Sequence, residues 1–260
     1  MTAIDLNCDM GEFAAAVADG SQTALMRFVS SVNVACGGHA GDRDTMRSTA
    51  RQAMEAGLSI GAHPGYPDRA NFGRFELDMA PGELSDSVAW QVGELASLVS
   101  ELGGLLTHVK PHGALYNQAA GNRELARAIV DGVARVDRGL VLVGLAGSRM
   151  LEVFREAGFA VAAEGFCDRA YEADGTLRSR RLDGALIRDP QRAAAQAVRM
   201  ARDGVVTAVD GTEVRVEAAT LCIHGDTPGA EAIAAAVAGA LRGAGLAVRG
   251  LGRASGDVGQ

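Results

Sequence analysis

The sequence contains little lysine, few aromatic residues and no long apolar run. Lys110 is the only lysine, so the other 24 of the 25 basic residues are arginine. Aromatic residues make up 4% of the 260 positions, and aliphatic side chains must therefore fill the core that a 48% hydrophobic content can build. The longest weakly polar run, residues 232–241, is alanine-rich and too short to span a bilayer. We expect one large globular domain with no membrane partner.

Charge and cysteine spacing exclude further classes of protein. A net charge of −7, without a compensating basic run, argues against nucleic acid as a partner. The four cysteines are far apart and form no C-x-x-C pair, which indicates reduced thiols rather than a disulfide framework. No basic segment followed by an apolar stretch opens the chain, so we expect no signal peptide and a cytoplasmic location. The lack of a G-x-x-x-x-G-K-[ST] segment excludes a P-loop.

Short apolar runs alternate with amphipathic segments from one end of the chain to the other. The apolar runs predict strands at residues 4–8, 31–36, 58–62, 105–109, 140–143, 159–166 and 219–223, with a short further candidate at 246–248. The amphipathic segments predict helices at about residues 42–57, 83–102, 122–133, 148–158, 189–204 and 227–241. Two segments, 171–186 and 205–216, contain Asp-Gly turns and are predicted as small β-hairpins. The long loop at residues 63–82 is typical of a functional lid.

About seven strand–helix units in a row imply a parallel sheet with right-handed crossovers. Such a sheet is either a closed barrel or an open, doubly wound sheet. Polar residues follow strand after strand here, whereas an open sheet concentrates its ligands at one switch point. We therefore predict an α/β fold of the (β/α) barrel class, formed by one domain over residues 1–251 and followed by a flexible tail at residues 252–260.

The single lysine lies between two histidines, His108 and His112. Burial can tune a lysine ammonium towards neutrality, whereas an arginine guanidinium stays charged and forked. The alternative is that codon bias favours arginine throughout the chain and that Lys110 is a chance exception. Two histidines so close to it favour a functional position. Because Pro111 ends the predicted strand, Lys110 and His112 should reach the barrel mouth, with His108 one pleat deeper.

Carboxylates and histidines also end the first three predicted strands. Asp9 and Glu12 follow the first, where they could bind a divalent metal or share acid–base work, or merely cap a helix. His39 lies in a glycine-rich turn after the second strand, and His63 ends the third. Together Asp9, His39 and His63 resemble a zinc or other divalent-metal site that activates water. This hypothesis requires the barrel, because no short spacing joins the three residues.

Charged residues follow the later strands as well. Arg169 could clamp a substrate carboxylate with both of its terminal nitrogens, or it could form a pair with Asp168 that only closes the barrel rim. A histidine and an aspartate follow the last long strand. The candidate substrate-binding residues are Asn7, Tyr116, Arg169, His224 and Asp226.

Seven motifs, in the same order and over nearly the whole chain, resemble the LamB/YcsF family. They are D-L-N-C-D-M-G-E (5–12), N-V-A-C-G-G-H-A-G-D (33–42), G-A-H-P-G-Y-P-D (61–68), F-G-R-F (72–75), V-K-P-H-G-A-L-Y-N (109–117), F-C-D-R-A-Y (166–171) and C-I-H-G-D-T-P-G (222–229). The chain has Cys167 and Gly65 where the family often has alanine and serine, and neither residue has a proposed role.

The resemblance implies a (β/α) barrel of the glycoside hydrolase/deacetylase type, often seven-stranded. It implies a component of an ATP-dependent 5-oxoprolinase, which opens the lactam ring of 5-oxo-L-proline to L-glutamate with hydrolysis of ATP to ADP and phosphate. The implied partners are B and C subunits, and the implied cofactors are ATP with Mg²⁺ and a divalent metal in the barrel mouth.

Residue roles follow from this resemblance. Asp9, His39 and His63 would hold or orient water, with Glu12 as a further acid–base group. Lys110 and His112 would polarise the carbonyl or stabilise transferred phosphoryl charge. Two alternatives stay open: a metal-dependent deacetylase-like or glycosidase-like hydrolase that acts alone, and a non-catalytic binding subunit.

Overall fold

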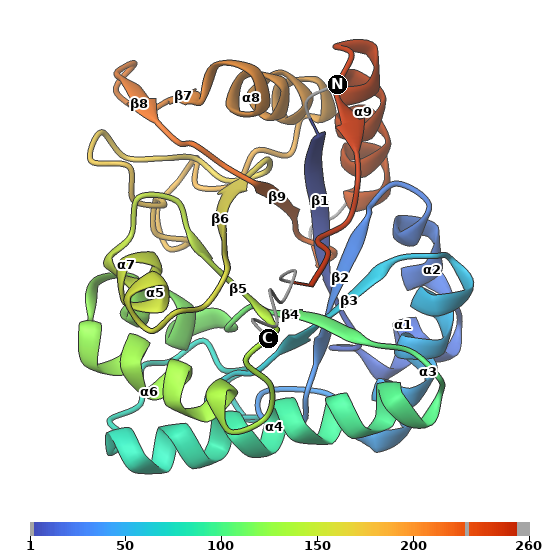
Figure 1. Ribbon diagram of the computed structural model, residues 1–260. Helices are drawn as coiled ribbons and strands as arrows, with labels where there is room; N and C mark the ends of the chain where they lie inside the picture. Colours follow the sequence, from blue (N-terminus) through green and yellow to red (C-terminus); the bar gives the residue numbers. More distant parts are fainter. Residues whose placement is uncertain (1–2, 227–228, 254–260) are drawn as a thin grey trace, which may run out of the picture.

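The computed structural model describes residues 3–226 and 229–253, and its centre is a closed parallel barrel (Figure 1). Within these residues, seven strands pair in the order β1-β2-β3-β4-β5-β6-β9, and β9 pairs with β1 to close the ring. The strands are β1 (Ala3–Met10), β2 (Ser31–Ala35), β3 (Ser59–His63), β4 (Leu106–Val109), β5 (Val141–Leu145), β6 (Val161–Phe166) and β9 (Thr220–Ile223). The predicted seven-stranded barrel is therefore confirmed.

Helices surround the ring of strands on its outside, as Figure 1 shows. They are α1 (Ala14–Ala18), α2 (Ser21–Met26), α3 (Arg43–Glu55), α4 (Pro81–Glu101), α5 (Gly113–Gly121), α6 (Arg123–Ala134), α7 (Arg149–Glu156), α8 (Pro190–Asp203) and α9 (Ala230–Gly243). The sequence predicted six of these but missed α1, α2 and α5. Side-chain caps explain several starts, since Asp42 forms a capping box with Thr45 and Asn122 accepts from the Leu125 amide.

Both predicted hairpin segments pair antiparallel around their Asp-Gly turns. Strands β7 (Val205–Thr207) and β8 (Glu213–Arg215) form the longer pair. In segment 171–186 the pairing is limited to an isolated antiparallel bridge between Tyr171 and Leu177, where the Glu172 amide donates to the Thr176 carbonyl at 2.8 Å. The Arg169 guanidinium donates to the carbonyls of Arg178 and Ala185 at 2.6 and 3.4 Å and so holds this segment.

Residues 247–253 contact strands of the barrel. The short strand β10 (Ala247–Val248) pairs with β1 outside the closed ring. Thr227 and Pro228, predicted to open the final helix, lie outside the described residues, as do residues 254–260 of the predicted tail. At the start of that tail, Arg253 is held by the Leu106 carbonyl at 3.1 Å and by Asp137 at 2.5 Å.

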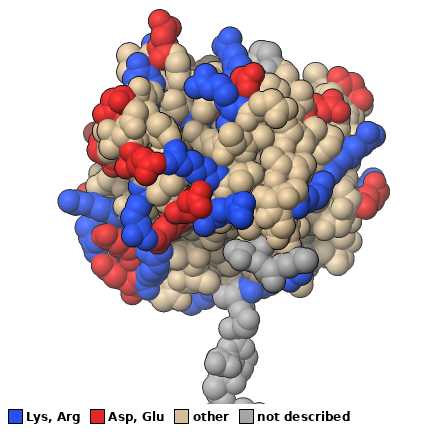
Figure 2. All heavy atoms as spheres, turned by 90° about the horizontal axis from the view of Figure 1, so that it is seen from above, with Lys and Arg blue, Asp and Glu red and all other residues tan. Residues whose placement is uncertain are grey.

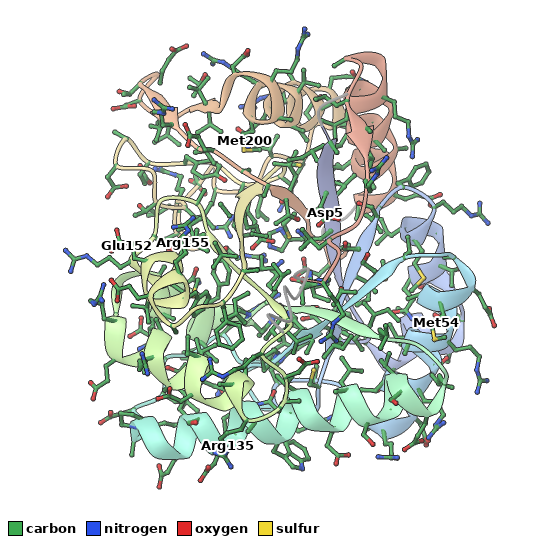
Figure 3. The ribbon with its side chains drawn as sticks, in the orientation of Figure 1. Asp5, Met54, Arg135, Glu152, Arg155 and Met200 are labelled. Atoms are coloured by element: carbon green, nitrogen blue, oxygen red, sulfur yellow. The ribbon has the colours of Figure 1, made fainter. Side chains whose placement is uncertain are left out.

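The inside of the barrel is polar. On β1 the outward residues Leu6 and Cys8 belong to the apolar core, whereas Asp5 and Asn7 face the inside of the ring. Figure 3 labels Asp5 within the ring of strands. Its carboxylate accepts hydrogen bonds from Ser30, Ser31 and Thr220 at 2.5–2.7 Å. These hydrogen bonds offset the free-energy cost of burying a carboxylate. They also connect β1 to β2, to β9 and to the loop before β2.

The surface and the thiols agree with the expectations from composition. All four cysteines are free and buried. Among the described residues, no helix combines the length and the apolar character that crossing a membrane requires. On the face seen in Figure 2, basic and acidic side chains are intermixed rather than separated by sign. This pattern matches exposed ion pairs such as that between Arg199 and Glu213.

Gly61 on β3 leaves the space that the His108 ring fills, because a Cβ atom at position 61 would overlap that ring. We expect Gly61→Ala to lower the free energy of unfolding by about 1–3 kcal/mol, the usual effect of overpacking. His108 would have to leave Asn33, to which it hydrogen-bonds at 2.9 Å. Chemical denaturation measures the change. Gly82→Ala is the matched control, since no atom lies within 4 Å of a Cβ there. Equal stability of the two variants would contradict this account.

Candidate active site

A cavity of about 970 Å³ opens at the carboxyl ends of the barrel strands. It gathers nine of the eleven site residues that the sequence predicted: Asp9, Glu12, His63, Lys110, His112, Tyr116, Arg169, His224 and Asp226. The other two, Asn7 and His39, are 1% exposed and lie behind this lining. The parallel strands explain the convergence, because their carboxyl ends meet at one end of the barrel.

Lys110 is 3% exposed and lies at the centre of a buried polar network. Its ammonium donates to Asp9 Oδ1 at 3.0 Å and lies 3.0 Å from Glu164 Oε1. Asn7 Oδ1 at 3.3 Å and the Cys222 sulfur at 3.1 Å complete the surroundings. One ammonium thus balances two carboxylates, from β1 and β6, which both pair with β9. Lys110 is therefore a structural centre of the barrel as well as a candidate catalytic group.

This network corrects the expectation for the charge of Lys110. Burial alone would lower its pKa, but Asp9 and Glu164 raise the pKa well above the ordinary value, so the side chain stays charged. Asn7 belongs to this network as well. Its amide nitrogen donates to Glu164 and its amide oxygen accepts from Lys110 beneath the cavity lining, so it positions Lys110, and its contact with substrate stays a prediction. Glu164 was missed because it lies inside an otherwise apolar strand.

Three histidines and a carboxylate form a second cluster beside this network. Its members are Glu12, His39, His63 and His112, and their ligand atoms all lie within 4.8 Å of one another. Glu12 Oε1 lies 3.1 Å from His39 Nε2 and 3.3 Å from His112 Nδ1. The rings of His39 and His112 stack with centroids 3.6 Å apart. The loop-borne His39 and Glu12 thus meet histidines from β3 and from the end of β4.

The outer nitrogens of two of these rings are occupied by backbone. His63 Nδ1 donates to the Lys110 carbonyl at 2.7 Å, and His112 Nε2 donates to the Phe72 carbonyl at 2.9 Å. In their neutral forms the two rings therefore direct lone pairs inward, and these inner nitrogens lie 2.9 Å apart. Two lone pairs at this distance repel unless a cation lies between them, and the cation is a proton or a metal ion.

Electrostatics of the cluster support a cation. Burial and the neighbouring His63 lower the pKa of His39 to about 2 and hold the pKa of His112 well below its ordinary value. For His63, burial acts downwards but Asp9 outweighs it and raises the pKa. Burial and Asp9 raise the pKa of Glu12 to about 7. An imidazole nitrogen without a proton is a typical metal ligand when the other ring nitrogen donates to a carbonyl, as in His63 and His112. The residues of the cluster therefore fit a divalent cation.

The predicted metal set matches this cluster in part. His39 and His63 belong to it, and Glu12 and His112 are the other members. Asp9 lies beside it, with Oδ2 at 3.3 Å from His63 Nε2 and Oδ1 bound to Lys110. Ligation by Asp9 stays a prediction. Burial alone would raise the pKa of Asp9, but His63 and Lys110 outweigh it and hold this pKa well below its ordinary value, so the carboxylate is ionised.

Phe72 and Gly73 contact the histidine cluster, which residue type and spacing did not reveal. Phe72 has a φ of 56°, the one positive φ outside glycine in the described residues. This strained backbone aims its carbonyl at His112. At Gly73, with φ of 62°, a Cβ would lie 2.7 Å from the Cβ of His39. The F-G-R-F motif in the loop of residues 63–82 was the available signal, and this loop closes over the cluster.

Asp168 and His224 form a dyad at another part of the cavity. His224 Nδ1 lies 2.8 Å from Asp168 Oδ1, and the His224 backbone amide donates to Oδ2 at 2.9 Å. Asp168 is fully buried; burial acts upwards on its pKa, but His224 outweighs it and holds the pKa below the ordinary value. The carboxylate thus fixes one ring nitrogen of a cavity-lining histidine, and no described residue hydrogen-bonds its Nε2, which is therefore available for proton transfer. This geometry favours a positioning role for Asp168 over simple rim closure.

Replacement of Asp168 by asparagine should lower kcat by about 10²–10⁴-fold, because a neutral amide no longer holds the His224 ring as the carboxylate does. KM should change little, because Asp168 does not line the cavity, whereas a purely structural role would lower the amount of folded protein. Asp189→Asn retains the side-chain cap of α8 and lies outside the cavity lining, so it is the matched control. Wild-type kcat would rule out the dyad.

Arg169 and Tyr116 offer binding groups to the same cavity. Arg169 is 7% exposed, and no carboxylate of the described residues lies within ion-pair distance of it. Burial and the nearby Arg180 lower the pKa of Arg169 to about 10, so it remains a cation without a counter-ion. The buried Tyr116 hydroxyl makes no hydrogen bond within 3.5 Å among the described residues, but it lies near Glu164, and burial together with the charge of Glu164 raises the pKa of Tyr116 well above its ordinary value. Asp226, by contrast, is already engaged by Arg74 at 2.6 Å.

Fold and site together define a class of protein, a parallel α/β barrel with a histidine–carboxylate centre at the carboxyl ends of its strands. The chain belongs to the LamB/YcsF family, whose model matches residues 4–256. It is 50% identical over 246 residues to the 5-oxoprolinase A subunit from Heliobacterium modesticaldum, with 95% of this chain and 97% of the relative covered. It is 51% identical over 249 residues to the 5-oxoprolinase A subunit from Chloroflexus aggregans, with 96% and 99% covered.

A solved structure agrees with this assignment. The lactam utilization protein from Thermus thermophilus superimposes with a TM-score of 0.89 at 45% sequence identity. The match covers 95% of this chain and 99% of that protein. The resemblance seen in the sequence motifs is thereby confirmed, and so is the barrel architecture.

Proposed function

We propose that this chain is the A subunit of an ATP-dependent 5-oxoprolinase, a hydrolase that opens the lactam ring of 5-oxo-L-proline to L-glutamate. ATP is hydrolysed to ADP and phosphate in the same reaction, and B and C subunits complete the working complex. The names of the relatives that match nearly the full chain support this proposal. The name of the similar solved structure, a lactam utilization protein, is consistent with a cyclic amide as substrate.

The observation that carries the proposal is the pair of inward-facing nitrogens on His63 and His112, 2.9 Å apart beside Glu12. Hydrolysis of an amide requires a water molecule to be activated at a site that can hold positive charge. A divalent metal held by Glu12, His39, His63 and His112 would supply a Lewis acid that lowers the pKa of water. Without a cation, burial and Asp9 raise the pKa of Glu12 to about 7, whereas a metal ion would hold this carboxylate in its ionised form as a ligand.

The remaining residues supply orientation and proton transfer. The unpaired guanidinium of Arg169 binds the substrate carboxylate, which satisfies a buried cation. His224, held by Asp168, gives a proton to the ring nitrogen as the lactam C–N bond breaks, so that an amine rather than an amide anion leaves. The Tyr116 hydroxyl donates to the substrate from the cavity wall. Lys110 keeps Asp9 and the cavity floor in place.

Reconstitution tests this proposal directly. The purified chain is mixed with its B and C subunits, ATP and 5-oxoproline, and glutamate and ADP are measured. We expect no turnover from the chain alone and coupled formation of both products from the complete mixture. Turnover of acetylated sugars by the chain alone, without ATP, would instead support the deacetylase alternative. Full activity of the mixture with His63→Ala would support a non-catalytic binding subunit.

A further inference from the structure

The rim of the cavity carries a positive charge that the proposed lactam chemistry does not use. The cavity lining contains seven basic residues against four carboxylates, although the whole chain has a net charge of −7. The basic residues are Arg74, Lys110, Arg149, Arg169, Arg180, Arg181 and Arg215. The acidic ones are Asp9, Glu12, Asp174 and Asp226. A cleft whose sign is opposite to that of the whole molecule attracts anions.

Much of this charge has no counter-ion. Arg74 and Arg180 both meet the single carboxylate of Asp226, at 2.6 and 3.5 Å, so this trio keeps one positive charge. Arg149 and Arg181 are exposed, and in residues 3–226 and 229–253 neither has a carboxylate partner within 4.0 Å. Below them Arg169, more than nine-tenths buried, has none either. Guanidinium groups without carboxylate partners, two exposed (Arg149 and Arg181) and one buried (Arg169), can together bind an anion that has several oxygen atoms.

The shape of the rim agrees with such a ligand. Gly147 and Ser148 lead from β5 into α7 at the cavity edge, and Arg149 is the first residue of that helix. Backbone N–H groups at a helix start favour anions. The cavity volume of about 970 Å³ is at the upper end of the roughly 300–1,000 Å³ typical of ligand pockets. A single five-membered lactam with one carboxylate leaves much of that space empty.

We propose that Arg149, Arg180 and Arg181 form a phosphate-binding rim above Arg169. This rim takes the phosphate group of a ligand that enters the cavity together with the lactam or is attached to it. The inference rests on the proposed function, because ATP-coupled ring opening requires a phosphate group near the substrate. Two sources share this chemistry: the terminal phosphate of ATP and a phosphoryl group already transferred to the substrate.

Binding by the isolated full chain tests the rim without any need for turnover. Isothermal titration calorimetry with inorganic phosphate should show one site, and Arg149→Gln/Arg181→Gln should weaken it at least about tenfold, as loss of two charge-assisted contacts does. The control Arg51→Gln/Arg188→Gln removes the same charge from exposed positions outside the cavity and should leave the affinity unchanged. No phosphate binding by the wild-type chain, or equal weakening in both double variants, overturns the proposal.

A second titration, with ATP, separates the two sources. Binding of ATP that is also lost in Arg149→Gln/Arg181→Gln assigns the rim to the nucleotide. Binding of phosphate without binding of ATP assigns it to a phosphorylated substrate. The rim could also dock an acidic surface of a B or C subunit; loss of complex assembly in this variant with unchanged phosphate binding overturns the phosphate site. Failure of 5-oxoproline turnover in the reconstituted wild-type complex would contradict the proposed function but not phosphate binding.

Discussion

Replacement of His63 by alanine is expected to lower kcat for 5-oxoproline hydrolysis in the reconstituted complex by at least about 10³-fold, near the upper range for one catalytic group. His63 contributes an inner nitrogen to the cluster and faces both Asp9 and His112. Without it, the cluster keeps only Glu12, His39 and His112 and loses the nitrogen that faces His112 at 2.9 Å. Steady-state kinetics of the complex give the change in kcat.

A second readout separates a metal role from a proton role. Metal content by mass spectrometry should be close to one divalent ion per wild-type chain and near zero in His63→Ala. His108→Gln is the matched control, because His108 is fully buried, binds Asn33 and lies outside the cavity lining. It should lose stability yet keep the metal. Wild-type turnover by His63→Ala would refute the catalytic assignment, and equal metal loss in the His108 variant would refute the assigned ligands.

Replacement of Lys110 by methionine is expected to lower the free energy of unfolding by about 3–5 kcal/mol, the usual result of breaking a buried ion pair from one side. Asp9 and Glu164 each lie 3.0 Å from the ammonium. Without it, Glu164 would lose its ion pair, and Asp9 would keep only His63 as an ion-pair partner, at 3.3 Å. Chemical denaturation of the isolated chain measures the change. The double variant Lys110→Met/Glu164→Gln should recover part of the loss, because it leaves one fewer carboxylate unpaired.

Lys110→Arg keeps the charge and tests the shape of the site. A guanidinium is larger than the ammonium it replaces and must fit among Asp9, Glu164 and Cys222, so we expect a smaller loss of about 1–3 kcal/mol from overpacking. The fold should persist, while kcat of the complex falls by about 10²-fold or more as Asp9 shifts. Near-full turnover of Lys110→Arg would contradict the requirement for lysine, and wild-type stability of Lys110→Met would contradict the ion-pair network.

Much of the fold followed from the sequence because barrels leave a local signature. Each strand was an apolar run, and most were followed by residues such as His63 or Asp168 that no core would accept without partners. Helix α5 was missed because Ala114, Leu115 and Tyr116 are buried in succession, which gives no single apolar stripe. Glu164 was missed because one carboxylate inside an apolar strand has no local signal; only Lys110, from another strand, explains it.

The sequence by itself determined the α/β barrel, the set of polar residues at its mouth and the family. The tertiary structure alone decided how those residues act on one another. His63 and His112 are 49 positions apart, yet their inner nitrogens are 2.9 Å apart because β3 and β4 are neighbours in the ring. It likewise decided that Lys110 stays charged between two carboxylates and that Asn7 accepts a hydrogen bond from its ammonium. Such pairings depend on distances across a closed ring, which spacing along the chain does not encode.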